Sequence, residues 1–361
     1  MSDEPLYYGD YLQLSKLLGA QELQSAKVGE PVHDEMLFII VHQAYELWFK
    51  QIIWEIDSVL AIFGKDQVDE TDMRTALARL RRIHRIERLL IEQIAVLETM
   101  TPLDFLDFRD QLFPASGFQS AQFRIVENKL GIRPEDRLLL AGADYTDRFT
   151  SEDRDVVVSL ENEPSLFDLV ESWLERTPFL DHEDFHFWEA YQGAVHARIK
   201  SDREVVANNP NLTEGEREAQ LEEFERILSQ YSAIFDPARH QHERDAGRLR
   251  FSHRAFQAAV FITLYRDQPA LHEPFGVLEL LMDIDEGFTT WRYRHAQMAL
   301  RMIGRRVGTG GSAGAKYLEK SAERSRVFGD LMDLSTFLVP RGDRPTLPEG
   351  IVEAMRFRYE A

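Results

Sequence analysis

Apolar residues recur along most of this chain at the three- and four-residue spacing of an α-helix. No stretch sustains the strict alternation of apolar and polar residues that is typical of a half-buried strand. The pattern therefore predicts an all-α fold, a multi-helix bundle, with helix boundaries defined to about three residues. The predicted helices span residues 33–63, 70–99, 164–176, 213–235, 252–266, 272–304 and 313–337.

The two most apolar helical stretches each carry a histidine. His42 lies within residues 36–50, which are apolar almost all round, as in a buried helix. His295 is followed by Met298 and Met302 on the same helix face. Such a histidine is more often a hydrogen-bonded core residue than a ligand, because burial of an unpaired imidazole costs free energy. A neutral imidazole on an apolar face is, however, also a good metal ligand.

One charged segment interrupts the apolar helices. Thr213 and Glu216 have the spacing of a capping box and predict the start of a highly charged helix. We find no internal repeat and no low-complexity tract. We therefore predict a single domain over residues 1–361, with a charged helical excursion at about 199–248 and a loosely held tail after about 340.

Composition narrows the chemistry that such a domain can perform. The chain has 361 residues, of which 44% are hydrophobic and 11% aromatic, enough for a substantial core. It contains no cysteine, which excludes disulfides, zinc–thiolate sites, iron–sulfur clusters and thiolate-ligated haem. A bound metal would need histidine, carboxylate or tyrosine ligands.

The net charge of −20, from 42 basic and 62 acidic residues, disfavours binding to the phosphate backbone of nucleic acids and to anionic lipid surfaces. The first residues are acidic where a signal peptide would be basic, and no apolar run is long enough to span a membrane. We expect a cytoplasmic protein with a small-molecule partner and no nucleic-acid or membrane partner.

Three further places in the chain are candidates for binding. Arg109 follows the aromatic stretch 105–108, so it is either a surface ion-pair residue or a half-buried site for a carboxylate. Ser116 and Gly117 are typical of a turn that begins a helix. The glycine-rich residues 308–314 are most simply an interhelical loop, because they lack the lysine and the spacing of a phosphate-binding loop.

A rival motif is present at His182, Glu183 and His186. These residues match the H-E-x-x-H pattern, in which two histidines on one helix bind zinc and the glutamate acts as a general base. The context is poor, because the motif sits at the start of a predicted helix and no third ligand follows at a familiar spacing. His240 and His242 lie in a charged stretch that we expect to be a loop.

Seven stretches of the chain can be compared with known families: residues 8–14, 33–43, 46–51, 97–101, 116–120, 291–295 and 308–312. In unchanged order, they resemble the tryptophan 2,3-dioxygenase family. The resemblance extends from about Tyr8 to Pro340, and the long charged segment around Thr213 is similar to that of the larger, animal-type members. The family's counterpart of the His182 stretch is not a metal site.

The resemblance implies an all-α bundle that encloses a haem b pocket. His295 matches the axial ligand of the haem iron, and Trp291 would pack against this proximal side. Ser116 and Gly117 would line the distal side near the haem. Ferrous haem would be the active form, with dioxygen as co-substrate.

The resemblance also assigns residues to L-tryptophan. His42 matches the distal histidine that accepts a hydrogen bond from the indole N–H. Arg109 matches the residue that binds the substrate carboxylate, and Thr309 matches a loop residue that fixes the ammonium and carboxylate groups. The family is homotetrameric, and N-terminal tyrosines reach a neighbouring site. The apolar walls around the indole would come from Phe38, Phe105, Leu112, Tyr8 and Tyr11.

The implied reaction is cleavage of the indole C2=C3 bond by dioxygen to give N-formyl-L-kynurenine, the first step of the kynurenine route of tryptophan catabolism. One departure is Ala313, where family members usually carry a serine after Ser312. Three alternatives stay open: a haem oxygenase acting on another indole, a zinc peptidase using His182, Glu183 and His186, and a helical interaction protein without chemistry.

Overall fold

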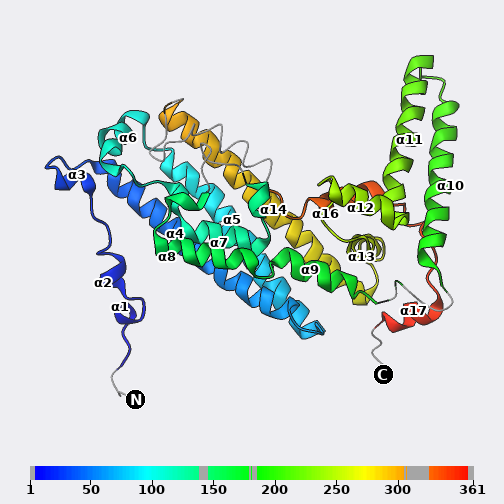
Figure 1. Cartoon of the computed structure of the whole chain (residues 1–361), viewed down its shortest axis with the longest axis horizontal. Helices are drawn as coiled ribbons and strands as arrows, with labels where there is room; N and C mark the ends of the chain where they lie inside the picture. Colours follow the sequence, from blue (N-terminus) through cyan, green and yellow to red (C-terminus); the bar gives the residue numbers. More distant parts are fainter. Residues whose placement is uncertain are drawn as a thin grey trace. The chain divides into compact units, whose positions relative to one another are not determined.

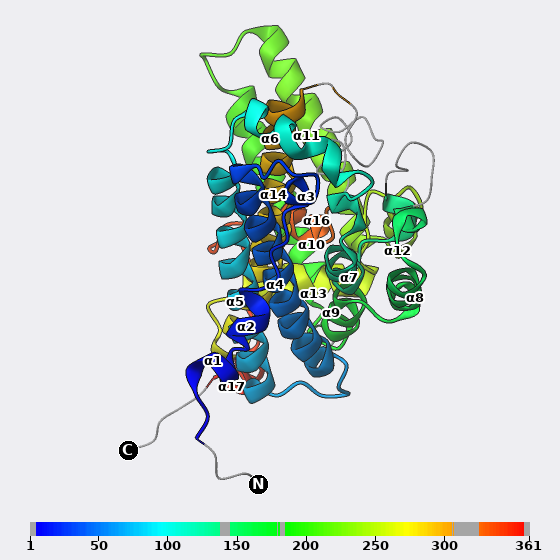
Figure 2. The ribbon, with the colours of Figure 1, turned by 90° about the vertical axis from the view of Figure 1, so that its left-hand side faces the viewer.

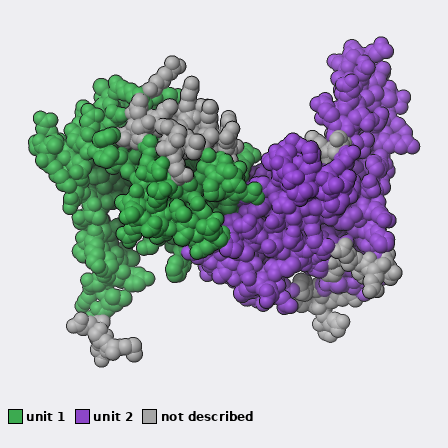
Figure 3. Space-filling view, in the orientation of Figure 1, with its two compact units in different colours: residues 1–56, 82–163, 286–326 green, residues 57–81, 164–285, 327–361 purple. Residues whose placement is uncertain are grey.

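The computed structural model describes residues 5–137, 145–178, 180, 185–304, 306 and 325–356. Within those ranges all regular secondary structure is helical, which confirms the all-α prediction. The chain divides into two compact units (Figure 3). Unit 1 comprises residues 1–56, 82–163 and 286–326, and unit 2 comprises residues 57–81, 164–285 and 327–361. The predicted organisation as a single domain stays a prediction.

Three long helices contribute residues to both units: α4 (His33–Phe63), α5 (Glu70–Leu97) and α14 (Pro269–Ile303). The predicted boundaries of α4 are confirmed at both ends. Helix α14 begins three residues earlier than predicted and continues through Pro274. None of the helices in the described ranges has the length and apolarity needed to cross a membrane.

In unit 1, α4 and α5 lie side by side (Figure 2). The Tyr45 hydroxyl donates to the Leu90 carbonyl at 2.7 Å, and the Gln93 amide donates to the Val41 carbonyl at 2.9 Å. Helix α14 approaches α5 closely at Gly287, where a β-carbon would lie 2.6 Å from the Glu87 carboxylate.

The shorter helices of unit 1 begin at side-chain caps that short apolar patterns do not reveal. Thr101 and Asp104 form a capping box at the start of α6 (Pro102–Arg109), and the Ser120 hydroxyl caps α7 (Ala121–Leu130). None of α6, α7 and α8 was predicted. The remaining elements are α1 (Tyr8–Tyr11), α2 (Leu14–Leu17), α3 (Gln24–Lys27), α6 (Pro102–Arg109), α7 (Ala121–Leu130), α8 (Ser151–Ser159), and the 3₁₀ turns η1 (Asp110–Leu112), η2 (Gly117–Gln119), η3 (Pro134–Asp136), η4 (Tyr145–Arg148) and η5 (Leu160–Asn162).

The segment that precedes α4 is anchored to it by a buried carboxylate. Glu35 is fully buried and accepts hydrogen bonds from the backbone N–H groups of Gln24 and Ser25, at 2.7 and 3.0 Å. Gln43 accepts a hydrogen bond from the Gln21 amide and donates one to the Ala20 carbonyl. Residues 20–25 are therefore fixed on the N-terminal half of α4.

Unit 2 is built from α9 (Leu166–Glu175), α10 (Phe187–Ala207), α11 (Glu214–Phe235), α12 (Pro237–Asp245), α13 (His253–Leu264), α16 (Gly329–Asp333), η6 (Leu334–Phe337) and α17 (Glu349–Ala354). Helices α10 and α11 run side by side as a hairpin (Figure 1). This hairpin contains much of the predicted charged segment at about 199–248, although α10 begins well before it.

The stretch around His240 and His242 is the helix α12, so the loop expected there is wrong. The Asp236 carboxylate caps the helix by accepting from two backbone N–H groups, and Pro237 occupies its first position. His240 is buried and its Nε2–H donates to the Phe251 carbonyl at 2.9 Å. The charged composition of α12 concealed these local helix signals.

Two predictions near the C-terminus are also corrected. Residues 313–324 of the predicted helix 313–337 lie outside the described residues, and the remainder is helical only from Gly329. The Asp285 carboxylate accepts the backbone N–H groups of Val327 and Phe328, at 2.8 and 3.1 Å, which removes them from helix hydrogen bonding.

The stretch expected as a loose tail after about 340 is instead packed within unit 2. Arg344 forms an ion pair with Asp267, at 2.6 Å, and the Tyr265 hydroxyl donates to the Pro345 carbonyl. Ile351 and Met355 are buried. These contacts hold the chain in place as far as the end of α17.

Candidate functional site

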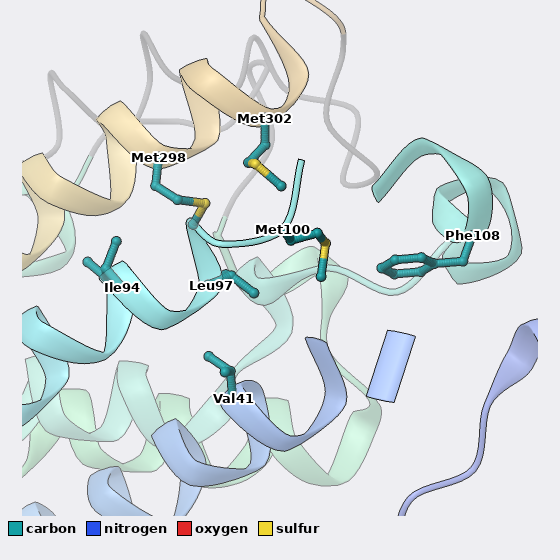
Figure 4. Packing of buried hydrophobic residues seen from close by; sticks show 7 residues of the cluster. All are labelled: Val41, Ile94, Leu97, Met100, Phe108, Met298 and Met302. Atoms are coloured by element: carbon teal, nitrogen blue, oxygen red, sulfur yellow. The ribbon is translucent and has the colours of Figure 1, made fainter. Parts of the chain in front are cut away.

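Several of the predicted site residues of unit 1 lie against one apolar cluster, whose buried members are shown in Figure 4. Four elements supply its buried members, and two methionines of α14 face α5 and the turn that follows it. Phe38, Phe105, Leu112 and Trp291 pack against this cluster. The cluster consists of Val41, Ile94, Leu97, Met100, Phe108, Met298 and Met302.

His42 is held in one tautomer by its own helix. Its Nδ1 lies 2.7 Å from the Phe38 carbonyl one turn earlier, and a carbonyl can only accept, so Nδ1 carries the proton. Burial lowers the pKa of His42, against the opposing effects of this hydrogen bond and the Glu46 carboxylate. The imidazole is therefore neutral at pH 7, and its Nε2 lone pair, which has no partner among the described residues, is a hydrogen-bond acceptor.

One aromatic ring contacts His42 directly, and two further rings pack against that ring. The Phe38 ring lies 4.1 Å from the imidazole, centroid to centroid, and 5.6 Å from the Phe105 ring. Phe108 meets both phenylalanines edge to face and is fully buried. The sequence analysis did not select Phe108, although its position three residues after Phe105 on α6 is a signal for it.

Arg109 ends α6 and begins the tighter turn η1, which carries Leu112. Its side chain is 20% exposed, and its Nη1 lies 3.4 Å from the neighbouring Asp110 carboxylate, which is almost entirely in solvent. That ion pair is long and exposed, so it is weak. Arg109 follows Phe108 at the end of α6, so its guanidinium comes from the helix that supplies Phe105 and Phe108.

Ser116 and Gly117 form the start of the 3₁₀ turn η2. The Ser116 hydroxyl accepts from the Phe118 N–H, and the Gln119 side chain accepts from the Ser116 N–H, as in a capping box. The prediction of a turn that begins a helix is confirmed at this point. Whether Ser116 and Gly117 also line a cofactor stays a prediction.

His295, on α14, differs from His42 in having no hydrogen bond to any described residue. Its ring is stacked on Trp291, at 5.3 Å between centroids and 24° between planes. Burial, with a smaller contribution from nearby His42, lowers the pKa of His295 to about 4. A neutral buried imidazole has one nitrogen lone pair that a metal can bind, and no described residue accepts a hydrogen bond from its N–H.

An aromatic group behind Trp291 completes the site, and the sequence analysis missed it. Tyr45 and Phe49 come from α4, and Phe123 comes from α7, with ring centroids 6.0, 6.1 and 5.0 Å from that of Trp291. Tyr45 and Phe49 follow His42 at helical spacing, so their face was predictable. Nothing in the sequence marks Phe123 as part of it.

Three predicted residues are not brought to this site by the described chain. Tyr8 and Tyr11, on α1, are 74% and 70% exposed. Thr309 and its glycine-rich neighbours, with Ala313, lie outside the described residues. The predicted roles of these residues therefore stay predictions.

The zinc motif has no support in the described residues. His182 and Glu183 lie outside them, and His186 precedes the first residue of α10, so it is not on that helix. In the described ranges, no three histidine, aspartate or glutamate side chains are grouped as a metal site. The H-E-x-x-H geometry requires both histidines on one helix.

Comparison with known proteins gives consistent matches over nearly the whole chain. Residues 1–338 match the family model described as tryptophan 2,3-dioxygenase. A tryptophan 2,3-dioxygenase of Bdellovibrio bacteriovorus is 49% identical over 359 residues, 99% of this chain and 100% of the relative. One from Xenopus tropicalis is 48% identical over 99% of this chain and 87% of the relative, and one from Dictyostelium discoideum is 44% identical over 98% and 89%. Matches over almost the whole length of this chain therefore occur in bacteria as well as in animals.

Proposed function

Because the chain belongs to the tryptophan 2,3-dioxygenase family, we propose that it cleaves the indole C2=C3 bond of L-tryptophan with dioxygen. Both oxygen atoms enter the product, N-formyl-L-kynurenine. The observation that carries this proposal is the fixed tautomer of His42, which leaves Nε2 as an acceptor beside the Phe38 ring, together with Arg109 on the helix that supplies Phe105. An indole N–H and an amino-acid carboxylate are the complements of those two groups.

The residues on the proximal side fit haem b. His295 is neutral, stacked in one orientation and free of hydrogen bonds to described residues, and Met298 and Met302 add apolar surface on the same helix. His295 would therefore hold the iron, with Trp291 against its ring. Ser116 and Gly117 would line the opposite side. When bound in its ferrous form, haem supplies the activation of dioxygen.

The chain's own contribution is orientation and the exclusion of water. His42 accepts the indole N–H through Nε2 and stays hydrogen-bonded to Phe38 through Nδ1, so the ring does not rotate. Phe38, Phe105 and Leu112 form the apolar walls, which favour a planar indole over water. Holding the reacting bond in one place provides the main acceleration, so His42 acts by orienting and polarising the substrate.

Recognition of the amino-acid part of the substrate is assigned to Arg109 and Thr309. The planar guanidinium of Arg109 binds a carboxylate through two parallel hydrogen bonds. Thr309 would contribute from its loop to both the ammonium and the carboxylate. These assignments favour free L-tryptophan over other indoles.

We further propose a cytoplasmic homotetramer in which Tyr8 and Tyr11 complete the indole pocket of a neighbouring chain. Both side chains are exposed in one copy, although residues 20–25 behind them are fixed on α4. Deletion of residues 1–12 should raise KM for L-tryptophan while haem is retained. Titration of the truncated haem protein with L-tryptophan provides the measurement, and an unchanged affinity would contradict the proposal.

The function is tested by reducing the haem-loaded protein without oxygen and then adding L-tryptophan and ¹⁸O₂. The expected product is N-formyl-L-kynurenine with two labelled oxygen atoms. A product with one labelled oxygen atom would indicate a single-oxygen insertion. Turnover of another indole, but not of tryptophan, would favour a haem oxygenase that acts on that other indole. Zinc in place of iron would point to the peptidase, and the absence of both metals would point to an interaction protein.

A further inference from the structure

The aromatic and basic stretch 291–295 contains an arginine to which the proposed function gives no role. Arg292 is buried, with 4% of its surface exposed, and its Nη2 donates to the Glu127 carboxylate of α7 at 2.8 Å. Glu127 is equally buried. This ion pair joins α14 to α7 three residues before His295.

Glu127 is the common partner of three arginines. Arg124 donates to it at 2.7 Å, and Arg137 approaches it at 3.7 Å. Burial by itself would raise the pKa of the Glu127 carboxyl, but Arg124, Arg292 and Arg137 together hold it at about 2. The carboxylate is therefore ionised at every pH at which the protein is used, and both of its oxygens are committed to guanidinium groups.

The network continues away from α14 and is anchored there. Arg137 also donates to the Asn128 side chain, whose amide donates to the Val157 carbonyl of α8 at 2.9 Å. The Arg137 guanidinium lies 4.2 Å from the centre of the Tyr145 ring. Arg292 is thus held by a framework that includes α7, α8 and the turns between them.

An apolar contact reaches the same turn of α14 from the same helix. Phe123, one turn before Glu127, packs against Trp291 at 5.0 Å, and the Arg292 guanidinium lies 5.5 Å from the Phe123 ring. Trp291 in turn stacks on His295. The ion pair and the ring contact therefore constrain the rotation of α14 about its axis at the residues that precede His295.

We infer that Glu127 and Arg292 are positioning residues that set the direction of the His295 imidazole toward the haem iron. This inference rests on the haem site in the proposed function. Buried ion pairs seldom add stability over an apolar replacement of the same volume, so stability alone is a weak explanation for this one. A directional, hydrogen-bonded pair restricts the helix more sharply than apolar packing does, and residues that orient a metal ligand affect how tightly the metal is held.

The test compares Glu127→Gln with Asp330→Asn as a matched control. Asp330 is also a buried carboxylate, and it accepts two backbone N–H groups, from Arg250 and Phe251, within unit 2. Both substitutions replace a carboxylate by its isosteric amide and should lower Tm. Glu127→Gln alone should change the spin state of the ferric haem and the iron–imidazole stretching frequency.

Glu127→Gln should also accelerate haem dissociation by roughly tenfold, the size usual for a residue behind a metal ligand. Arg292→Lys keeps the ion pair but loses the planar fork, so it should shift the same spectra less. If Glu127→Gln does not fold, the same spectra and haem dissociation rate are measured on Arg292→Lys.

The inference would be overturned if the Glu127→Gln and Arg292→Lys proteins had the haem spectra and dissociation rates of wild type and only a lowered Tm, as in Asp330→Asn. The ion pair would then have a structural role alone. Equal spectral changes in Asp330→Asn would overturn it as well. A wild-type protein that binds no haem would instead contradict the proposed function, so the two failures are distinguishable.

Discussion

On α4 the imidazole of His42 is tied to the backbone, whereas on α14 the imidazole of His295 is held by the flat face of Trp291. Both rings are buried, and burial lowers the pKa of each, so both are neutral at pH 7. They differ in what fixes them. The hydrogen bond to Phe38 assigns one nitrogen of His42 as donor and leaves the other as a directed acceptor.

His295 has no such bond among the described residues, and stacking fixes the plane of its ring without occupying either nitrogen. In the proposed function, this contrast lets one side-chain type serve two purposes in one site. A residue that binds a neutral N–H needs a defined tautomer, and a metal ligand needs an unshared electron pair in a defined plane.

The largest effect is expected when the imidazole of His295 is removed from α14. His295→Ala should abolish haem retention, because the chain has no cysteine to replace the ligand and the hydrogen bond to Phe38 fixes the imidazole of His42 in its place on α4. Iron content and Soret absorbance per chain measure this loss. The matched variant His42→Ala should keep its haem, and a fully loaded His295→Ala protein with a histidine-ligated spectrum would contradict the assignment.

The second effect in size concerns the guanidinium of Arg109, at the end of α6. Removal of Arg109 would leave a substrate carboxylate without its partner, which costs about 2–5 kcal/mol. Arg109→Lys keeps the charge but not the two parallel hydrogen bonds, so kcat/KM should fall at least as far as in His42→Ser.

Steady-state kinetics with L-tryptophan and with tryptamine, which lacks the carboxylate, separate this role from general damage. Wild type should discriminate strongly against tryptamine, and Arg109→Ala should lose most of that discrimination. Equal turnover of the two compounds by wild type would show that Arg109 does not bind the carboxylate.

A smaller effect is expected when the directed acceptor itself is removed. One hydrogen bond to a neutral indole N–H is worth about 0.5–1.5 kcal/mol, so His42→Ser should lower kcat/KM by roughly tenfold without abolishing it. Turnover of L-tryptophan and of 1-methyltryptophan, which has no N–H, gives the measurement. An inactive His42→Ser protein with its haem in place would mean that the imidazole removes a proton.

The smallest expected effect is a shift of the acidic limit of kcat/KM to lower pH. Burial depresses the pKa of His42 below its usual value, and the Phe38 carbonyl and Glu46 oppose this only in part. The ring gains a proton, and loses its acceptor, only when the pH falls below the ordinary histidine range. The acidic limb of kcat/KM should therefore lie below pH 6.5 in wild type and disappear in His42→Ser. A limb above that pH would contradict the shift.

The sequence predicted those features that depend on a long periodic pattern. The apolar run around His42 is sufficient to place α4 from end to end, and the spacing of Trp291 and His295 implies that their rings stack one turn apart. The side chains that surround these histidines come partly from short helices. Their starts depend on single caps such as Thr101 and Ser120, which periodicity does not register.

Long-range pairs were the least predictable part of the site. Glu127 and Arg292 are 165 positions apart, and each resembles an ordinary surface charge when read in its own helix. Only the packing of α7 against α14 makes them partners. The same holds for Asp285, whose hydrogen bonds to Val327 and Phe328 replaced an expected helix with an irregular segment.

The close approach of α14 to α5 at Gly287 has a consequence for how this family diverges. A single methyl group at that position would meet the buried Glu87 carboxylate at 2.6 Å, two helical turns before His295. The atoms that it would meet are the far end of a flexible side chain, so an alanine there can be accepted if the Glu87 carboxylate moves out of its present place. Natural homologues can therefore carry alanine at position 287 and keep glutamate at position 87, provided that this carboxylate takes another rotamer.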